Sequence, residues 1–308
     1  QCEGCVFLRN FSASRFRVRE AIVYAGGIGQ LIGLLEKHGL EKPVVKAALS
    51  ALHNLATAKR CIDEAREYDL IAKTFDLIDI HSESETLQEV AFALLWNLAM
   101  SPELAADIVR QGGVKKVIWA LDKFKSSIEV IVPVVGMLRN LLVGSSFARL
   151  AAAEYYEAGG LTSLLELMWK HCLPDSKTRA RKRKELEGEF RIPMETYSME
   201  SNTKMAEQML AVLHNFSVIP KDNHDYLAWV TGEFDQDKAV TDKLREVLEI
   251  HQASSMSQYQ GLAFIRQLIA NNKALKPNFH GFGLHIFAMV KMHKDTPVTD
   301  AGELLLEE

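Results

Sequence analysis

The chain has 308 residues, of which 48% are apolar and 25% charged, which excludes a disordered or fibrous protein. Its net charge is −4 and no apolar run approaches the ~18 residues of a membrane helix, so the composition points neither to a nucleic-acid nor to a membrane partner. Four cysteines are too few for a disulfide framework, which predicts a reducing compartment such as the cytoplasm.

The first elements along the chain are predicted to be three helices. Residues 15–24 suggest a short helix, which the glycine pair at 26–27 ends. A second helix follows to residue 38, with apolar residues at helical spacing. A third helix opens at Pro43, where the missing N–H costs little, and reaches Ala56. No stretch of the chain alternates with the period of two that is typical of strands, so the chain is predicted to be all-α.

The end of this third helix recurs along the chain. The segments ALHNLA, LLWNLA, MLRNLL and VLHNFS each carry an apolar helix pattern ending in Asn, and FLRNFS at 7–12 is a fifth. The asparagines are Asn10, Asn54, Asn97, Asn140 and Asn215. They are spaced by 44, 43, 43 and 75 residues, and the last spacing equals one period of 43 with an insertion of 32.

A second marker keeps the same period. AGGIGQLIGLL begins at Ala25, QGGVKKVIWAL at Gln111 and AGGLTSLLEL at Ala158, while YDLIAKTFDLI at 68–78 fills the intervening place without the glycines. Two independent markers with one period predict a repeated unit of helix, helix and helix.

A three-helix unit near 43 residues, with a Gly-Gly break and an Asn late in the third helix, resembles the armadillo repeat over roughly residues 1–270. The resemblance implies a right-handed α-solenoid whose third helices line a concave groove. In that family the groove binds an extended peptide or a partner protein, and the Asn holds backbone groups there.

We expect a single armadillo-like solenoid over 1–292 and an acidic tail over 293–308. Its expected parts are a cap helix at 1–13, repeats at about 14–57, 58–100, 101–143, 144–218 with an insertion at 171–203, and 219–270, and a partial unit at 274–292. The fifth repeat is degenerate, because Gln267 replaces Asn. Pro133 predicts a late start or a kink in the third helix of repeat three. Polar caps are missing and the chain starts at Gln1, so we expect an excised segment of a longer protein.

Helical geometry places the positions eight, four and one before the Asn, and three after it, in one arc beside it. Small residues stand four before the Asn or Gln: Ser50, Ala93, Gly136, Ala211 and Ala263. Such residues suit either the approach of a partner's backbone or close packing of neighbouring helices, and both interpretations stay open. Nuclear-import receptors of the family carry Trp at this position, so a groove of their type is not predicted. The basic-lined groove of the catenins is the closer analogy.

The residues one before the Asn or Gln are all cationic, titratable or aromatic. Arg and Trp are frequent among interface hot spots, although a solvated edge that lacks acids would give the same pattern. The predicted partner-binding residues are Arg9, His53, Asn54, Trp96, Asn97, Arg139, Asn140, His214, Asn215 and Arg266. They fit an extended or helical partner segment with acidic and aromatic residues.

The insertion at 171–203 carries the run KTRARKRK at 177–184. This run fits a solvated loop or charged helix, but also a nuclear-localisation signal or a patch for an acidic surface. The nucleus therefore stays open as a location beside the cytoplasm.

The sequence contains no recognisable catalytic constellation. Cys2 and Cys5 form a lone C-x-x-C without further ligands for zinc. His81, Glu83 and Glu85 lie in HSESE, where a serine cap of the following helix is a simpler explanation than a site. We predict no enzyme activity, no cofactor, no metal and no small-molecule substrate.

The sequence thus favours a non-enzymatic scaffold or adaptor that binds a partner protein. A regulatory domain of a larger signalling protein and a structural subunit of a large cytoskeletal or ciliary assembly are the alternatives. Nucleic-acid binding through residues 177–191 is not favoured, because the overall balance is acidic.

Overall fold

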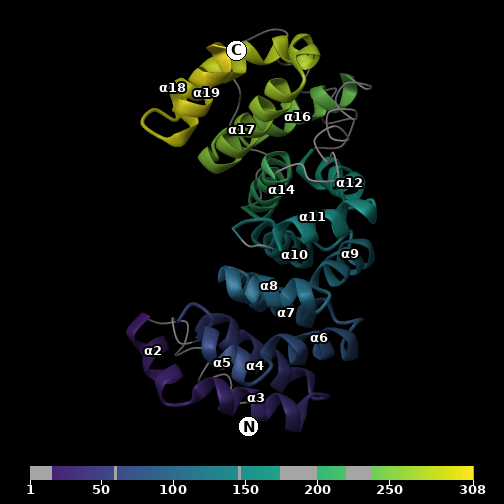
Figure 1. The fold of residues 1–308 in the computed structure, drawn as a ribbon, viewed down its shortest axis with the longest axis vertical. Coiled ribbons are helices and arrows are strands. Elements are labelled where there is room, and N and C mark those ends of the chain that lie inside the picture. The colour runs from purple at the N-terminus through teal and green to yellow at the C-terminus, as the bar shows by residue number, and fades with distance from the viewer. Residues whose placement is uncertain (1–15, 59–60, 145–146, 174–199, 220–237, 308) are drawn as a thin grey trace. The chain divides into compact units, whose positions relative to one another are not determined.

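The computed structural model describes residues 16–58, 61–144, 147–173, 200–219 and 238–307 (Figure 1). Every regular element in these ranges is a helix. The chain divides into two compact units, Gln1–Tyr155 and Tyr156–Glu308, which we call the N-terminal and the C-terminal unit and describe separately.

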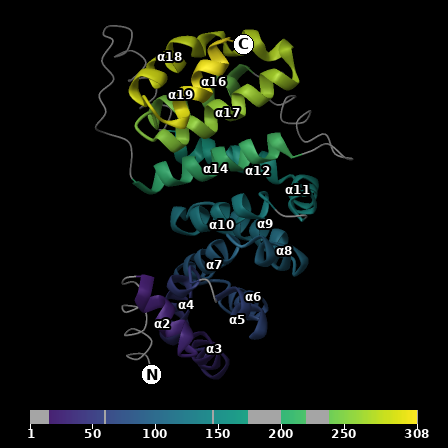
Figure 2. The same ribbon diagram turned by 60° about the vertical axis from the view of Figure 1, so that its left-hand side comes forward.

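The N-terminal unit repeats a group of three helices. Its described helices are α2 (Phe16–Tyr24), α3 (Gly27–His38), α4 (Lys42–Leu55), α5 (Cys61–Glu67), α6 (Leu70–Ile80), α7 (Glu85–Leu98), α8 (Pro102–Arg110), α9 (Gly113–Lys123) and α10 (Ile128–Leu141). The third helices of successive groups are neighbours, since α4 packs on α7 and α7 packs on α10 (Figures 1 and 2). The predicted succession of three helices per repeat is confirmed here.

Each corner between a first and a second helix needs one residue in the left-handed region of φ. Gly26 and Gly112 supply it, with φ of 77° and 87°. In the second group the same corner is formed by Asp69, whose φ is 50°. Asp is among the few residues other than Gly that visit this region routinely, because its short side chain can bond locally. The corner therefore survives where the Gly-Gly marker is lost.

The core of the N-terminal unit is formed by side chains at helical spacing on the third helices. Leu52, Phe92, Leu95 and Leu138 are fully buried. Helix α10 begins at Ile128 and continues through the buried Pro133, so the expected late start of this helix is wrong.

No single described helix is long and apolar enough to cross a membrane, although α2 and α3 together, bent by 67°, pass that test of length and composition.

The C-terminal unit has a third-helix row of its own. Its described elements are α12 (Gly160–Cys172), α14 (Glu200–Val218), α16 (Lys238–Ile250), α17 (Ser255–Asn271), the 3-10 helix η1 (Lys273–Phe282), α18 (Gly283–Met292) and α19 (Pro297–Glu307), while α11 (Ala148–Glu157) spans the division between the units. Helix α14 packs on α17, and α17 packs on α19 (Figure 2). Most of the insertion, at 174–199, lies outside the described residues.

Most of the expected acidic tail at 293–308 is instead a packed helix over 297–307. Helix α19 buries Val298, Ala301 and Leu305, which recur at a spacing of three and four residues, and it contacts both α17 and α18. The acidic residues Asp300 and Glu303 of this helix are exposed. The acidic composition of this segment made its amphipathic pattern difficult to recognise in the sequence.

A His–Gln pair joins the second and third helices of the second repeat. The amide Nε2 of Gln88 donates to the backbone oxygens of Ile78 and His81, at 2.9 and 3.0 Å. The imidazole Nε2 of His81 in turn lies 2.6 Å from the backbone oxygen of Gly39, one repeat earlier. The backbone oxygens of Ile78 and Gly39 at helix ends would otherwise lack a partner, whereas that of His81 also accepts from the Ser84 amide at 2.9 Å. The expected serine cap is absent, because Ser84 at the N-cap of α7 makes no capping bond.

The same pair recurs 170 residues later in the C-terminal unit. Gln258 Nε2 donates to the backbone oxygens of Leu248 and His251, at 2.8 and 3.2 Å. His251 Nε2 lies 3.3 Å from the backbone oxygen of Cys172. The sequence contains both pairs at identical spacing, but this spacing alone does not reveal the bonds that they form.

A half-buried histidine in α18 predicts that the C-terminal unit loses stability in mild acid. His285 Nε2 lies 3.1 Å from Gln258 Oε1, and burial, aided by the charge of Arg245, lowers its pKa to about 4. An unfolded chain binds this proton near pH 6.5, so the stabilisation is complete above that pH and is lost as the pH falls from 6.5 to 4.

We expect the unfolding free energy to fall by on the order of 1–2 kcal/mol between pH 7 and pH 5, measured by urea unfolding. The variant His285→Gln should show a smaller fall over the same interval. An equal fall in the variant would contradict this assignment.

Candidate partner-binding face

The predicted binding residues that the structure describes lie on the third helices, and all are half-buried. The N-terminal unit holds His53 and Asn54 on α4, Trp96 and Asn97 on α7, and Arg139 and Asn140 on α10; the C-terminal unit holds His214 and Asn215 on α14 and Arg266 on α17. Arg9, Cys2, Cys5 and the basic run at 177–184 lie outside the described residues. We call the surface formed by the six residues His53, Asn54, Trp96, Asn97, Arg139 and Asn140, on α4, α7 and α10, the third-helix face.

The asparagines connect neighbouring third helices. Asn97 Nδ2 donates to the backbone oxygen of His53 at 3.0 Å, and Asn140 Nδ2 donates to that of Trp96 at 3.1 Å. Each amide thus uses at least one hydrogen within the protein itself. The bond is directed at the residue one before the Asn of the preceding repeat, so it fixes the backbone of the predicted binding row.

The small residue four before Asn140 receives a side chain of the preceding repeat. A Cβ added to Gly136 would lie 2.5 Å from Cε2 of the Trp96 indole. At this position of the N-terminal unit, packing inside the protein decides between the two interpretations, and the space is not left for a partner's backbone.

The charge of the third-helix face is concentrated at Arg139. Burial lowers the pKa of His53, and its Nδ1 accepts from Asn97 Nδ2 at 3.1 Å, which requires a neutral ring. The guanidinium of Arg139 donates to Asn140 Oδ1 at 3.3 and 3.2 Å from Nε and Nη2. These bonds are long and therefore weak. They orient the guanidinium, and exchanging them for bonds to a partner costs little energy.

Apolar side chains border this row where α7 and α10 end. Met100 and Val143 stand three after their Asn, and their exposed fractions are 68% and 53%. Helical geometry places this position in the arc beside the Asn, but the sequence alone does not indicate a role for its residues. The third-helix face therefore combines one guanidinium with an indole and two exposed apolar groups.

The C-terminal unit builds its row differently. His214 Nδ1 lies 2.8 Å from Gln260 Oε1, and its ring meets Tyr259 edge to face, with centroids 6.3 Å apart. Tyr259 stands eight before Gln267, within the arc that helical spacing defines. Tyr259 is not evident from the sequence, because Gln267 replaces the Asn from which the helical spacing is counted.

Within the described ranges, no three His, Cys, Asp or Glu side chains are grouped as metal ligands would be. Two buried thiols are present, and burial raises the pKa of Cys61 and of Cys172 to about 12. A thiol with such a pKa is a weak nucleophile at neutral pH.

The repeated helices place the chain in the class of armadillo-like α-solenoids, and solved structures agree. No protein-family model matches the sequence, and comparison with curated proteins gives no match. The designed armadillo repeat protein YIII(Dq)4CqI is similar in structure, with a TM-score of 0.62, 18% identity, and coverage of 87% of this chain and 92% of that one.

Two further structures show the same fold. The designed protein YIII(Dq.V1)4CPAF, solved in complex with the peptide (KR)4, has a TM-score of 0.61 at 18% identity and covers 86% of this chain and 92% of its own. SYS-1 has a TM-score of 0.51 at 10% identity, covering 96% of this chain and 55% of that protein. The chain therefore has the armadillo-repeat fold.

Proposed function

We propose that the chain is a non-enzymatic scaffold or adaptor that binds a segment of a partner protein on its third-helix face. The observation that carries the proposal is that Trp96 and the exposed Met100 stand at the end of α7 and Arg139 at the end of the neighbouring α10, with the Trp96 backbone oxygen bonded to Asn140. A face that is already ordered binds without the cost of ordering its side chains.

The chemistry of this face suits a segment that carries an acidic residue beside aromatic or aliphatic ones. A guanidinium forms charge-assisted bonds with a carboxylate, and exposed apolar side chains gain from being covered. Proteins of the same fold support a peptide-binding role, since one designed relative was solved with the peptide (KR)4 and SYS-1 was solved in a complex with POP-1. We further propose a cytoplasmic location.

Reversing the charge of Arg139 should weaken partner binding at least tenfold and leave folding nearly intact. The variant Arg139→Glu loses the attraction to an acidic group but removes no buried side chain, so its unfolding free energy should change by less than about 0.5 kcal/mol. The measurement combines capture of partners from the source cell with thermal unfolding, and includes the double variant Trp96→Ala with Arg139→Glu.

The matched control is Lys276→Glu, which makes the same charge change at an exposed position of η1. One or a few proteins should be lost by the third-helix variants and retained by this control. Recovery of the same proteins by all variants would refute the proposal, and a collapse of the thermal midpoint would make Arg139 structural.

A further inference from the structure

A second surface of the N-terminal unit has the features of a binding site. A hollow of about 580 Å³ lies where α8 meets α9, and α6 contributes to its wall. Its polar and aromatic lining is Asp79, Arg110, Gln111, Lys115, Lys116 and Trp119. None of these residues belongs to a third helix, so the hollow is separate from the third-helix face.

The lining of the hollow is positively charged, with three cations against the single carboxylate of Asp79. Asp79 forms an ion pair with Lys116, and Arg110 pairs with Asp107 outside the lining. Lys115 is exposed, and no protein partner for its ammonium is present in the described part of the chain. The hollow therefore retains a cation that is free to bind an external group.

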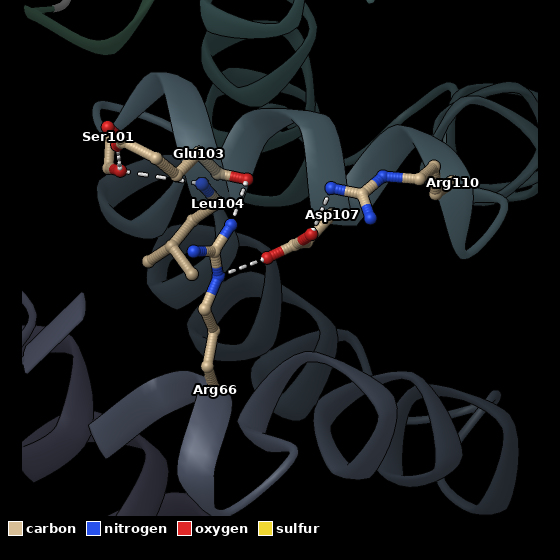
Figure 3. A network of polar contacts seen from close by, with 6 residues as sticks. All are labelled: Arg66, Ser101, Glu103, Leu104, Asp107 and Arg110. Atoms are coloured by element: carbon tan, nitrogen blue, oxygen red, sulfur yellow. Dashed lines mark hydrogen bonds and ion pairs between the residues drawn. The ribbon is translucent and has the colours of Figure 1, made fainter. Parts of the chain in front are cut away.

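The ion pairs also hold the wall in place. Asp107 is shared between Arg110 and Arg66, whose Nε lies 2.7 Å from it (Figure 3). The Arg110 guanidinium stands over the ring of Phe147, with 5.2 Å to its centroid. A cation fixed in this way loses little entropy when a ligand binds.

The cations are not a requirement of the fold. The same corner of the next repeat, in the C-terminal unit, also forms a hollow, but Glu157 and Thr162 stand there in the places of Arg110 and Lys115. In the second repeat, 43 residues earlier, these places hold Glu67 and Ala72. The corner folds without the positive charge, so its presence in the third repeat needs another reason.

An aromatic wall completes the hollow. Trp119 is half-buried, and Lys123 Nζ stands 5.4 Å from its ring centroid. An indole beside cations suits a ligand that carries an anionic group next to an apolar one. The volume lies within the usual range of about 300–1,000 Å³ for ligand sites.

We propose that this hollow binds an anionic side chain, a carboxylate or a phosphate, that is flanked by an aromatic or aliphatic residue on a partner protein. The anion lies between Arg110, Lys115 and Lys116, and the apolar neighbour covers Trp119. This would give the chain a second docking point, independent of the third-helix face.

The test uses two fluorescein-labelled 12-residue peptides, rich in glutamate around a central tyrosine or a central phosphotyrosine. Fluorescence anisotropy compares the whole chain with Lys115→Glu, with the charge-matched Lys276→Glu and with Arg139→Glu. We expect Lys115→Glu to weaken binding at least tenfold, and Lys276→Glu to stay within twofold.

The two peptides distinguish the sources of the anion. Tighter binding of the phosphotyrosine peptide, lost in Lys115→Glu, identifies a phosphate, and equal binding of both peptides, lost in the same variant, identifies a carboxylate. An equal loss in Lys115→Glu and Lys276→Glu, a loss in Arg139→Glu alone, or no measurable binding to the unchanged chain would overturn the proposal. Circular dichroism of Lys115→Glu shows whether a loss of binding comes from unfolding.

Discussion

Gly136→Ala is expected to destabilise the N-terminal unit by about 1–3 kcal/mol, although a single methyl group is added. The new Cβ would lie 2.5 Å from Cε2 of Trp96 and 2.6 Å from its Cδ2, so the indole must move away. An indole is a rigid double ring, and its displacement disturbs the contact between α7 and α10. Urea unfolding followed by circular dichroism measures the loss.

The matched control is Gly33→Ala in α3, because a Cβ there meets nothing within 4 Å. In an open helix position, alanine stabilises by about 0.5–1 kcal/mol relative to glycine. The two substitutions are chemically identical, so opposite signs would show that the Trp96 contact causes the difference. Equal effects would contradict the packing described for Trp96.

Gln88→Leu is expected to cost about 1–3 kcal/mol, because the backbone oxygen of Ile78 would lose its buried donor, while that of His81 keeps the Ser84 amide. Gln88 is fully buried, and leucine has a similar volume, so packing alone does not predict this loss. Gln258→Leu should destabilise the C-terminal unit by at least as much, because it also removes the bond to His285. Differential scanning calorimetry resolves which unit each variant affects.

Gln30→Leu, on the exposed side of α3, provides the control and should stay within about 0.5 kcal/mol. If Gln88→Leu were as mild as this control, the carbonyls would have found other donors and the His–Gln pair would not join the helices.

The fold was predictable to the extent that its markers repeat in sequence. The Asn at the end of the third helix and the Gly-Gly corner occur often enough to reveal a period near 43. Asp69 shows why the second marker fails once without consequence, since the corner needs a backbone conformation and not a particular residue. Helix α19 was missed because it has a strongly acidic composition and no marker of its own.

The candidate face was predictable in position but not in its internal contacts. Helical spacing placed Trp96 and Arg139 on one face, because spacing along one helix fixes direction around its axis. Helical spacing does not determine which residue of the neighbouring helix a side chain contacts. The packing of Trp96 on Gly136 and the bonds of Gln88 depend on how neighbouring helices are aligned, which no period in the sequence specifies.

The most direct test of the proposed face is photo-crosslinking from single positions of the whole chain in the source cell. Benzoylphenylalanine is placed at Met100, one turn beyond Trp96, or at Leu284, which is also exposed but lies on α18. The proposal predicts that specific proteins are crosslinked from Met100 and not from Leu284, and that Arg139→Glu abolishes these products. Crosslinking of the same proteins from both positions, or from Leu284 alone, would contradict it.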